Sequence, residues 1–506
     1  MVTLRSLQSP LLVGRDELLA LAERRIAEAK AGRSGLLLLA GEAGIGKSRL
    51  MRGAIRHATA EGFRYSKSDL APQDQLVPLA SLRDLARAME PSDFGTLGQR
   101  LIEMQGGKGG DSLASRRILV REIAELVIDA IDRPTLLAFE DLQWADELTL
   151  EIIGDLARLG HDRPLFLIAA YRLDELPVGS IHREWRSRLL TQRLAEEVRL
   201  ERLSRADTAL VTTLILGTGL PAPREVADAV YRRSNGIPLH IEELLAALGS
   251  EVADDGRSIE DASVPDTIED AVLARMQHLS EDAREVARAG AVMGRCFAPD
   301  VLAGIMDRPA ADLDGPIEEL VQSSILYPFD FVDQDYYDFR HQLLRDALYD
   351  TVPAAELRRL HARAGEFGAE LVGASDVHAS LHFERAGLHA QAFRAALNGA
   401  RAAAQVSSRY ESFELYRRAV ANMPESLAAA EKAGIYDEQI NAGSAVDDIR
   451  AIEDAARNAR RWFQEAGDAV GAARTLGPLI NVARRDVRPR SEREALIRQA
   501  ESELTA

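Results

Sequence analysis

The chain of 506 residues contains a single cysteine, Cys296. One thiol excludes an internal disulfide framework and is typical of a reducing compartment, so we expect a cytoplasmic protein. No stretch approaches the ~18 consecutive apolar residues that a membrane-spanning helix requires. The first residues also lack the charged-then-apolar pattern of a secretory leader. We therefore expect no membrane partner.

Aromatic residues are scarce, at 5%, and basic side chains are in deficit, with 62 Lys and Arg against 80 Asp and Glu. The net charge of −18 disfavours extensive binding to nucleic acids or anionic membranes, although a local basic patch remains compatible with it. A hydrophobic content of 46% with 28% charged residues is typical of a globular chain. The length predicts several domains.

The most informative stretch is an apolar run, residues 36–40, that leads into the pattern G-x-x-x-x-G-K-S and then a helix-compatible run. Glycines in this pattern let backbone N–H groups curl around phosphate oxygens, while Lys47 reaches the β- and γ-phosphates and Ser48 holds Mg²⁺. The alternative, a chance glycine turn between strand and helix, explains fewer of the fixed positions. The predicted nucleotide-binding residues here are Gly41, Gly44, Ile45, Gly46, Lys47, Ser48 and Arg49.

Two further apolar runs predict neighbouring buried strands. Residues 134–139 precede Glu140 and Asp141, and residues 164–171 precede Arg172. Carboxylates at the carboxyl end of a parallel strand, beside a phosphate-binding loop, are placed to organise Mg²⁺ and its waters. The alternatives are a helix cap for the carboxylates and an ordinary surface role for Arg172. Strands that alternate with helices predict a parallel α/β sheet that binds its ligand at the strands' carboxyl ends.

The sequence predicts that the rest of the chain is mainly helical. We expect a P-loop NTPase domain over residues 1–203, a helical lid with an acidic linker over 204–263, and a winged-helix-like domain over 264–355. Over residues 356–506 we expect TPR-like helical repeats that are incomplete. The linker is placed at residues 249–263, and a hairpin of residues 325–327 and 336–339 forms the wing. A small-residue motif around Gly387, Gly434 and Gly467 suggests the repeats.

The sequence of the predicted wing is not typical of a DNA-binding element. Its loop and second strand carry Asp330, Asp333, Asp335 and Asp338, with no Lys or Arg between residues 328 and 339. Those carboxylates would repel phosphates. We therefore expect no DNA-reading element here and an internal, regulatory role for the wing.

Taken together, these motifs resemble the STAND class of signalling NTPases, which is related to AAA+ ATPases. The nearest likeness is to the ATPase module of large LuxR-type transcriptional regulators, and to a similar module behind some bacterial adenylate cyclases. The segments that carry it are residues 13–18, 41–48, 139–146, 171–172, 234–243 and 339–349.

The resemblance implies roles for individual residues. Glu140 and Asp141 would order Mg²⁺ and the attacking water, and Arg172 would sense the γ-phosphate. Pro238 and the segment around Arg15 would line the adenine pocket, since ATP or ADP is the nucleotide that the resemblance implies.

His341 is the position expected to contact bound nucleotide from the winged helix, although a lone histidine is more often a core residue. The resemblance also implies an output domain outside this module, and neither a cyclase nor a basic recognition helix is evident in the sequence.

One departure from the usual pattern bears on activity. Many P-loop ATPases present Asp first and Glu second, whereas here Glu140 precedes Asp141. A misplacement of about one methylene can cost about a hundredfold in phosphoryl transfer, so we expect slow hydrolysis.

Three functions remain open at this point. The first is a nucleotide-dependent switch, in which a protein or small-molecule inducer binds the repeats and self-assembly follows. The second is a constitutively active AAA+ remodelling ATPase. The third is an interaction scaffold that nucleotide merely stabilises.

Overall fold

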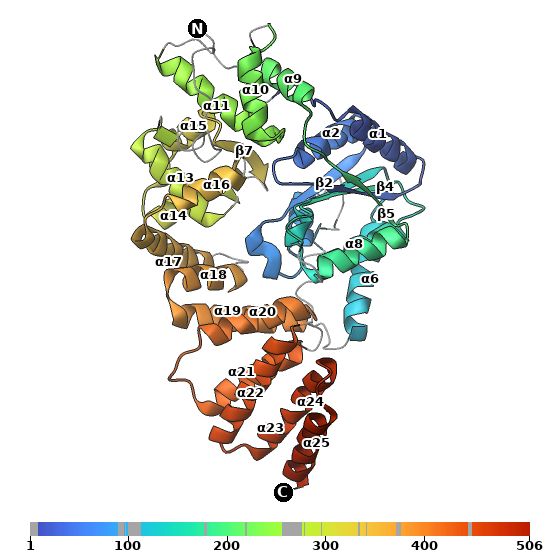
Figure 1. Ribbon diagram of the computed structural model, residues 1–506, viewed down its shortest axis with the longest axis vertical. Coiled ribbons are helices and arrows are strands. Elements are labelled where there is room, and N and C mark those ends of the chain that lie inside the picture. The colour runs from blue at the N-terminus through green and yellow to red at the C-terminus, as the bar shows by residue number, and fades with distance from the viewer. Residues whose placement is uncertain are drawn as a thin grey trace.

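The computed structural model describes residues 9–89, 96, 98–99, 113–176, 180–217, 220–255, 276–277, 279–294, 296–331, 334–340, 342–370, 376–443 and 448–505. Figure 1 shows an α/β part, a group of lid helices beside it, a smaller part with its own sheet, and a stack of helices that ends at the C-terminus.

The first part is built on five parallel strands in the order β2-β3-β4-β1-β5. Their bounds are β1 Gly35–Ala40, β2 Arg64–Asp69, β3 Thr135–Glu140, β4 Leu165–Tyr171 and β5 Ala195–Arg199. The helices are α1 Asp16–Lys30, α2 Lys47–Ala60, α3 Ala80–Ala88, α6 Leu113–Asp129, α7 Glu147–Leu159 and α8 Ile181–Thr191, with short 3₁₀ turns η1 Pro72–Leu76 and η2 Leu142–Trp144. The predicted α/β sheet is confirmed.

The three central strands are the ones that the sequence predicts. Every residue of β3 and β4 is buried, and β1 is buried after Gly35, because helices cover both faces of the sheet. The edge strands β2 and β5 escaped prediction. Their sequences, RYSKSD and AEEVR, are polar and lack a continuous apolar run. An edge position tolerates this composition since one side of the strand has no neighbour.

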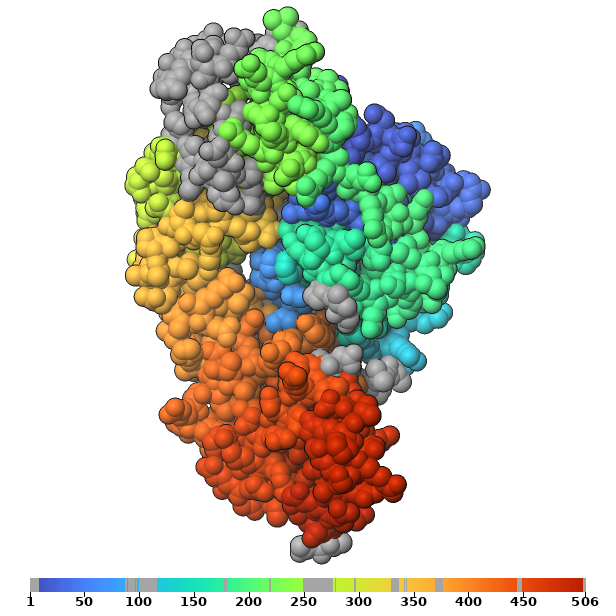
Figure 2. Space-filling model, in the orientation of Figure 1, coloured from blue at the N-terminus to red at the C-terminus, as the bar shows by residue number. Residues whose placement is uncertain are grey.

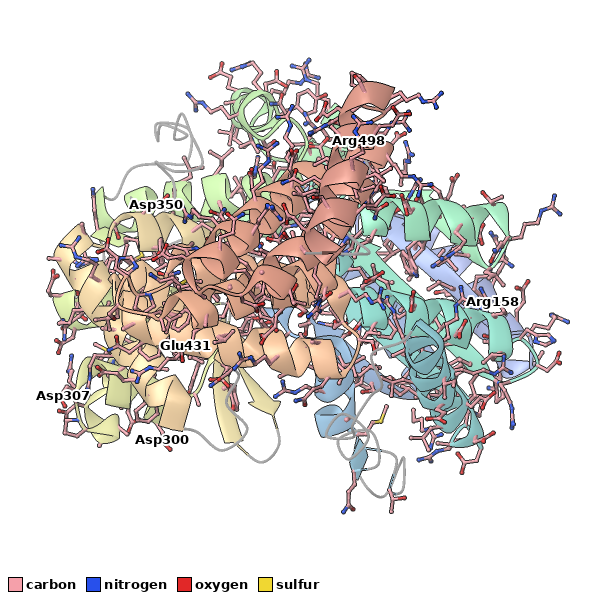
Figure 3. The ribbon with its side chains drawn as sticks, turned by 90° about the horizontal axis from the view of Figure 1, so that it is seen from below. Arg158, Asp300, Asp307, Asp350, Glu431 and Arg498 are labelled. Carbon is pink, nitrogen blue, oxygen red and sulfur yellow. The ribbon has the colours of Figure 1, made fainter. Side chains whose placement is uncertain are left out.

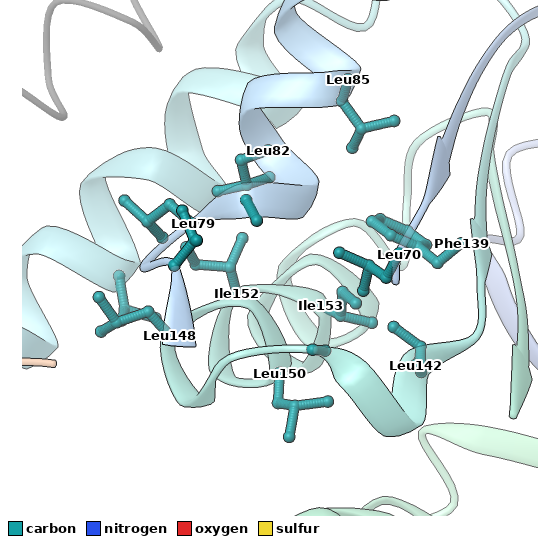
Figure 4. Close-up of a cluster of buried hydrophobic side chains, with 14 of the residues drawn as sticks. Leu70, Leu79, Leu82, Leu85, Phe139, Leu142, Leu148, Leu150, Ile152 and Ile153 are labelled. Atoms are coloured by element: carbon teal, nitrogen blue, oxygen red, sulfur yellow. The ribbon is translucent and has the colours of Figure 1, made fainter. Parts of the chain in front are cut away.

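One face of the sheet packs against α3 and α7 (Figure 4). Leu79, Leu82, Leu85, Ile152 and Ile153 all belong to this cluster, and each of the five is at most 1% exposed. Phe139 of β3 belongs to the same core and directly precedes the two carboxylates, Glu140 and Asp141. Burial of this strand therefore fixes where Glu140 and Asp141 lie.

The lid consists of α9 Arg205–Leu216, α10 Arg224–Ser234 and α11 Pro238–Asp255. Helix α11 runs through residues 249–255, so the prediction of a linker beginning at Gly249 is wrong for that segment. The buried face of Ile241, Leu244, Leu245 and Leu248 stabilises the helix, and the acidic residues that follow remain helix-compatible. Residues 256–263 of the predicted linker lie outside the described residues.

A second, antiparallel sheet follows, in the order β6-β8-β7. Its strands are β6 Cys296–Phe297, β7 Leu326–Phe331 and β8 Gln334–Phe339. The helices of this part are α13 Glu281–Met293, α14 Pro299–Met306, η3 Ala310–Asp312, α15 Asp314–Gln322 and α16 Gln342–Asp350. The predicted hairpin is confirmed, but its strands include most of the predicted connection. Asp338 is buried and accepts a hydrogen bond from the Tyr327 hydroxyl at 2.8 Å, so it does not face solvent.

The chain then forms helices that pack in sequence order toward the C-terminus (Figure 1). They are α17 Ala354–Glu370, α18 Asp376–Ala386, α19 His389–Gln405, α20 Arg409–Ala421, α21 Ala429–Ala442, α22 Ile449–Glu465, α23 Ala469–Arg474, α24 Leu476–Arg485 and α25 Arg490–Thr505. Gly387 and Gly467 lie in inter-helix turns with positive φ. Gly434, the third glycine of the small-residue motif, lies inside α21, so the motif does not mark the same structural position in all three places.

These helices also contact the α/β part (Figure 2). Glu411 on α20 accepts a hydrogen bond from the backbone N–H of Glu147 at 3.0 Å, and the His378 Nε2 atom lies 3.1 Å from Asp74 Oδ1. Phe393 of α19 and Leu415 of α20 belong to the same buried cluster as Phe139. The α/β part and the helical stack therefore share a core.

Charged side chains cover the periphery, as at Arg158, Asp300, Asp307, Asp350, Glu431 and Arg498 (Figure 3). Among the residues that the structure describes, no helix combines the length and apolar character needed to cross a bilayer.

A glycine pair tests the junction between the lid and the α/β part. Gly236 has φ +74°, and a Cβ there would lie 2.2 Å from the carbonyl oxygen of Leu203. Gly62 has φ +88°, but nothing lies within 4 Å of its Cβ position. We expect Gly62→Ala to lower the free energy of unfolding by only about 1–2 kcal/mol, the cost of a left-handed backbone for an L-residue. Gly236→Ala should lower it by clearly more, because its Cβ would also collide with the Leu203 carbonyl oxygen. Urea unfolding of both variants measures this. Equal losses would contradict the close contact.

Candidate nucleotide-binding site

The predicted site residues meet at the carboxyl edge of the large sheet. Strand β4 lies between β1 and β3, so the residues that follow all three strands are neighbours. Ala40 at the end of β1 is aligned with Tyr171 at the end of β4. The structure therefore brings the glycine-rich loop, the carboxylate pair and Arg172 together.

The loop between β1 and α2 has a backbone that favours glycine. Gly44 and Gly46 have φ values of +71° and +102°, and Gly46 precedes the first turn of α2 without a side-chain cap. A Cβ on Gly44 would lie 2.7 Å from Leu239 Cβ at the start of α11, whereas nothing lies within 4 Å of a Cβ on Gly46. The N–H groups that begin α2 thus form a positive helix terminus, which suits a phosphate.

Lys47 carries a buried charge, since the residue is only 7% exposed. Its ammonium group donates hydrogen bonds to the carbonyl oxygens of Gly41 and Glu42, both at 2.8 Å. Burial lowers the pKa of Lys47 to about 8, while the nearby Asp141 opposes this shift. Carbonyl oxygens bear no net charge, so an anionic phosphate would compensate this ammonium better than they do.

Ser48 and Glu140, the predicted Mg²⁺ ligands, lie in direct contact. The Ser48 hydroxyl donates to Glu140 Oε2 at 2.8 Å, and Lys67 Nζ lies 3.3 Å from Glu140 Oε1. Hydroxyl and carboxylate oxygens are the ligands that Mg²⁺ prefers. No group of three or more His, Cys, Asp or Glu suited to a metal occurs in the described ranges. A Mg²⁺ ion here would therefore need phosphate and water oxygens as well.

Asp141 and Arg172 form the second half of the site. Asp141 adopts φ +54°, which turns the chain immediately after β3. Its Oδ1 atom lies 3.1 Å from Gln143 Nε2 and 3.6 Å from Arg172 Nε. Arg172 also contacts Glu175 Oε1 through Nη1 at 2.6 Å and donates to Gln342 Oε1 through Nη2 at 2.6 Å. This arginine therefore links the carboxylate segment to α16.

The remaining predicted residues surround the loop from outside. Arg15 donates to the carbonyl oxygens of Ile45, at 3.4 Å, and Glu201. Pro238 begins α11, whose next residue Leu239 donates its N–H to the Gly44 carbonyl oxygen at 3.2 Å.

Arg49 does not turn toward the loop. Its guanidinium lies 3.3 Å from Glu242 on α11 and donates to the Leu11 carbonyl oxygen at 2.9 Å. Burial raises the pKa of Glu242 to about 7. His341 lies outside the described residues.

Sequence reasoning missed Lys67, Gln143 and Gln342. Lys67 lies on an edge strand that the sequence did not reveal, and Gln342 comes from 170 positions beyond Arg172. Only for Gln143 was there a local signal, because it follows the carboxylate pair within two residues.

The lowered pKa of Lys47 predicts a pH dependence of nucleotide binding. A phosphate favours the charged ammonium, so above pH 8 binding must include uptake of a proton, and affinity should fall by up to about tenfold per pH unit. Calorimetric titration of ADP between pH 7.5 and 9.5 in buffers of different ionisation enthalpy measures both effects. Lys47→Arg keeps its charge throughout and should lose this dependence. A wild-type affinity that is flat across the range would contradict it.

Comparison with known proteins agrees with this geometry. Residues 11–168 match the family model described as an AAA ATPase domain. An uncharacterised protein of Rhizobium meliloti is 27% identical over 376 residues, a match that covers 66% of this chain and 34% of the relative. The chain thus spans about a third of that relative's length.

Two solved structures show more distant likeness. A STAND protein (Signal Transduction ATPase with Numerous Domains) with a tetratricopeptide repeat sensor, from Pyrococcus horikoshii, has a TM-score of 0.47 at 12% identity, covering 97% of this chain and 72% of its own. A Walker-type ATPase of Pyrococcus abyssi has a TM-score of 0.33 at 14% identity, covering 67% and 96%. Scores this low carry no argument about function. The family match and the site together identify residues 11–168 as an AAA-type ATPase domain.

Proposed function

We propose that this chain is an ATP-binding signalling switch with slow hydrolysis, and that it acts as the sensor and regulatory module of a transcriptional regulator or a similar signalling protein. The observation that carries the proposal is the position of Arg172. This one side chain contacts Asp141 beside the P-loop and Gln342 at the start of α16.

The contacts of Arg172 explain how nucleotide state could reach the rest of the chain. Its guanidinium is shared between two carboxylates, Asp141 and Glu175, and one amide oxygen. A γ-phosphate is a stronger acceptor than the amide oxygen of Gln342. ATP would therefore favour an Arg172 that has left α16, whereas ADP would leave the present contact in place. A switch requires such a difference between two states.

The docking of the helical stack supports the same proposal. Glu411 on α20 accepts a bond from the N–H of Glu147, directly after Asp146, which caps α7. The carboxyl groups of Asp146 and Glu411 are both buried, and burial raises the pKa of each above its ordinary value. The positive charge of Arg116 compensates this cluster of acidic residues, since its Nη1 atom lies 2.8 Å from Glu147 Oε2. The same Nη1 atom lies 3.5 Å from the Ser407 carbonyl oxygen. An inducer that binds the stack could thus act on the segment after β3.

The order of the carboxylates supports slow turnover. The longer Glu140 side chain already reaches Ser48, where it would hold Mg²⁺, and the shorter Asp141 side chain would orient the water. Bound Mg-ATP would supply the phosphoryl group. The residues of the chain position it, compensate its charge and exclude solvent. Self-assembly in the ATP state and a cytoplasmic location complete the proposal.

Nucleotide content after purification tests the proposal. About one equivalent of ADP released on denaturation, with little steady-state ATP turnover, is the expected result for a resting switch. Lys47→Ala should lose the nucleotide, since each charge-assisted bond contributes about 1.5–3 kcal/mol, and should keep its fold because a buried ammonium is removed. An empty site with rapid ATP turnover would instead indicate a remodelling ATPase. A Lys47→Ala variant that still responds to an inducer would indicate a scaffold.

Removal of the α16 contact should open the switch. Gln342→Ala deletes the acceptor of Arg172, so we expect bound fluorescent ADP to exchange about tenfold faster, the equivalent of ~1.4 kcal/mol. Gln322→Ala is the matched control, because Gln322 on α15 is exposed and donates to Glu318 of its own helix at 3.2 Å. Stopped-flow exchange measures both variants. Equal exchange rates in the two variants and the wild type would contradict a role for this contact.

A further inference from the structure

A buried amide lies between Asp141 and Arg172, two of the predicted site residues. Gln143 is in η2, two residues beyond Asp141, and is only 4% exposed. Its Nε2 atom donates to Asp141 Oδ1 at 3.1 Å, and its Oε1 atom accepts from the backbone N–H of Arg172 at 3.1 Å. One side chain therefore joins the segments that follow β3 and β4.

The chemistry of the partners fixes the orientation of this amide. A backbone N–H can only donate, so the amide oxygen must face Arg172. An ionised carboxylate can only accept, so the NH₂ group must face Asp141. A reversed amide would set donor against donor and acceptor against acceptor, and the Gln143 side chain itself is buried.

The sheet explains why this bridge is needed. Pairing between β3 and β4 runs from Thr135 opposite Leu165 to Phe139 opposite Ala169. Beyond that point β3 turns away through the positive φ of Asp141, while β4 continues beside β1 to Tyr171. The side chain of Gln143 supplies a cross-strand hydrogen bond where the backbone ladder has ended.

Two donors converge on one oxygen of Asp141. Gln143 Nε2 and Arg172 Nε lie 3.1 and 3.6 Å from Oδ1, which constrains the plane of the carboxylate. The buried ammonium of Lys47 also acts electrostatically on this group, and Glu175 lies on the far side of Arg172. Neither hydrogen bond of Gln143 involves the P-loop.

We propose that Gln143 is a positioning residue for ATP hydrolysis, which orients the Asp141 carboxylate and sets its distance from Arg172. The inference rests on the proposed role of Asp141 and deepens it. It predicts that changes at Gln143 act on the chemical step and pass through Asp141, while nucleotide binding is retained.

A double-mutant cycle tests this prediction. Gln143→Glu keeps the shape of the side chain and the acceptor for Arg172 N–H, but it sets an oxygen against Asp141. We expect single-turnover hydrolysis of radiolabelled ATP to slow by ten- to a hundredfold, with ATP affinity within about threefold of wild type. In a chain that already carries Asp141→Asn, the same change should have little further effect, because the group it acts on is gone.

The split between kcat and KM gives a second readout that a purely structural role would not move. Because neither hydrogen bond of Gln143 involves the P-loop, Gln143→Glu should lower kcat and leave KM within about threefold of wild type. Gln143→Met, which removes both hydrogen bonds without adding charge, guards against failure of the first variant to fold. Gln439→Glu is the matched control, since Gln439 on α21 is also 4% exposed and lies in the helical stack. It should lower stability and leave kcat and KM unchanged.

The outcomes separate the two proposals. Wild-type rates in Gln143→Glu, or losses that add fully to those of Asp141→Asn, would overturn the positioning role alone. Wild-type hydrolysis in Asp141→Asn would overturn the proposed role of Asp141 in the function itself.

Discussion

The arrangement of this molecule depends on the insertion of β4 between β1 and β3 in a parallel sheet. Parallel strands end at the same edge, so this order places whatever follows β4 between the phosphate-binding loop and the carboxylates. Arg172 occupies that position. Burial of β3 and β4 on both faces holds the three segments in register, and loop residues alone could not fix them as firmly.

Charge is concentrated where the sheet ends, and much of it is buried. Lys47 is compensated by carbonyl oxygens, Glu140 by a hydroxyl and Lys67, and Asp141 by Arg172 and an amide. Such a set of buried charges is costly unless its members are paired. A phosphate and a divalent cation would add charges of opposite sign to the same place. Binding of a nucleotide therefore changes the partners of several residues at once, which suits a site that controls distant contacts.

Two of those distant contacts are observed. Arg172 reaches Gln342 of α16, and α7, which begins six residues after Asp141, receives Glu411 from the helical stack. Both involve segments that leave the same sheet edge. A displacement of the chain between Glu140 and Glu147 would thus change the contact with the helical stack, and a displacement of the stack would shift the segment that carries the carboxylates. This reciprocity is what thermodynamic linkage requires of a switch.

The central strands, the loop of residues 41–48 and the carboxylate pair could all be predicted from the sequence, because each is a local pattern: an apolar run, fixed glycines or charges at a strand end. The sequence also predicted the hairpin and the mainly helical character of the chain beyond the sheet. It missed β2 and β5, whose edge positions tolerate polar residues, and it ended α11 too early because acidic residues resemble a linker. The small-residue motif around Gly387, Gly434 and Gly467 did not show which of these glycines lie in turns, since a three-residue motif does not report helix phase. Only the tertiary structure could show that Lys67 and Gln342 reach the site and that Glu411 docks at the start of α7. Their placement follows from strand order and domain packing, which bring together residues far apart in the chain, and no local pattern encodes that distance.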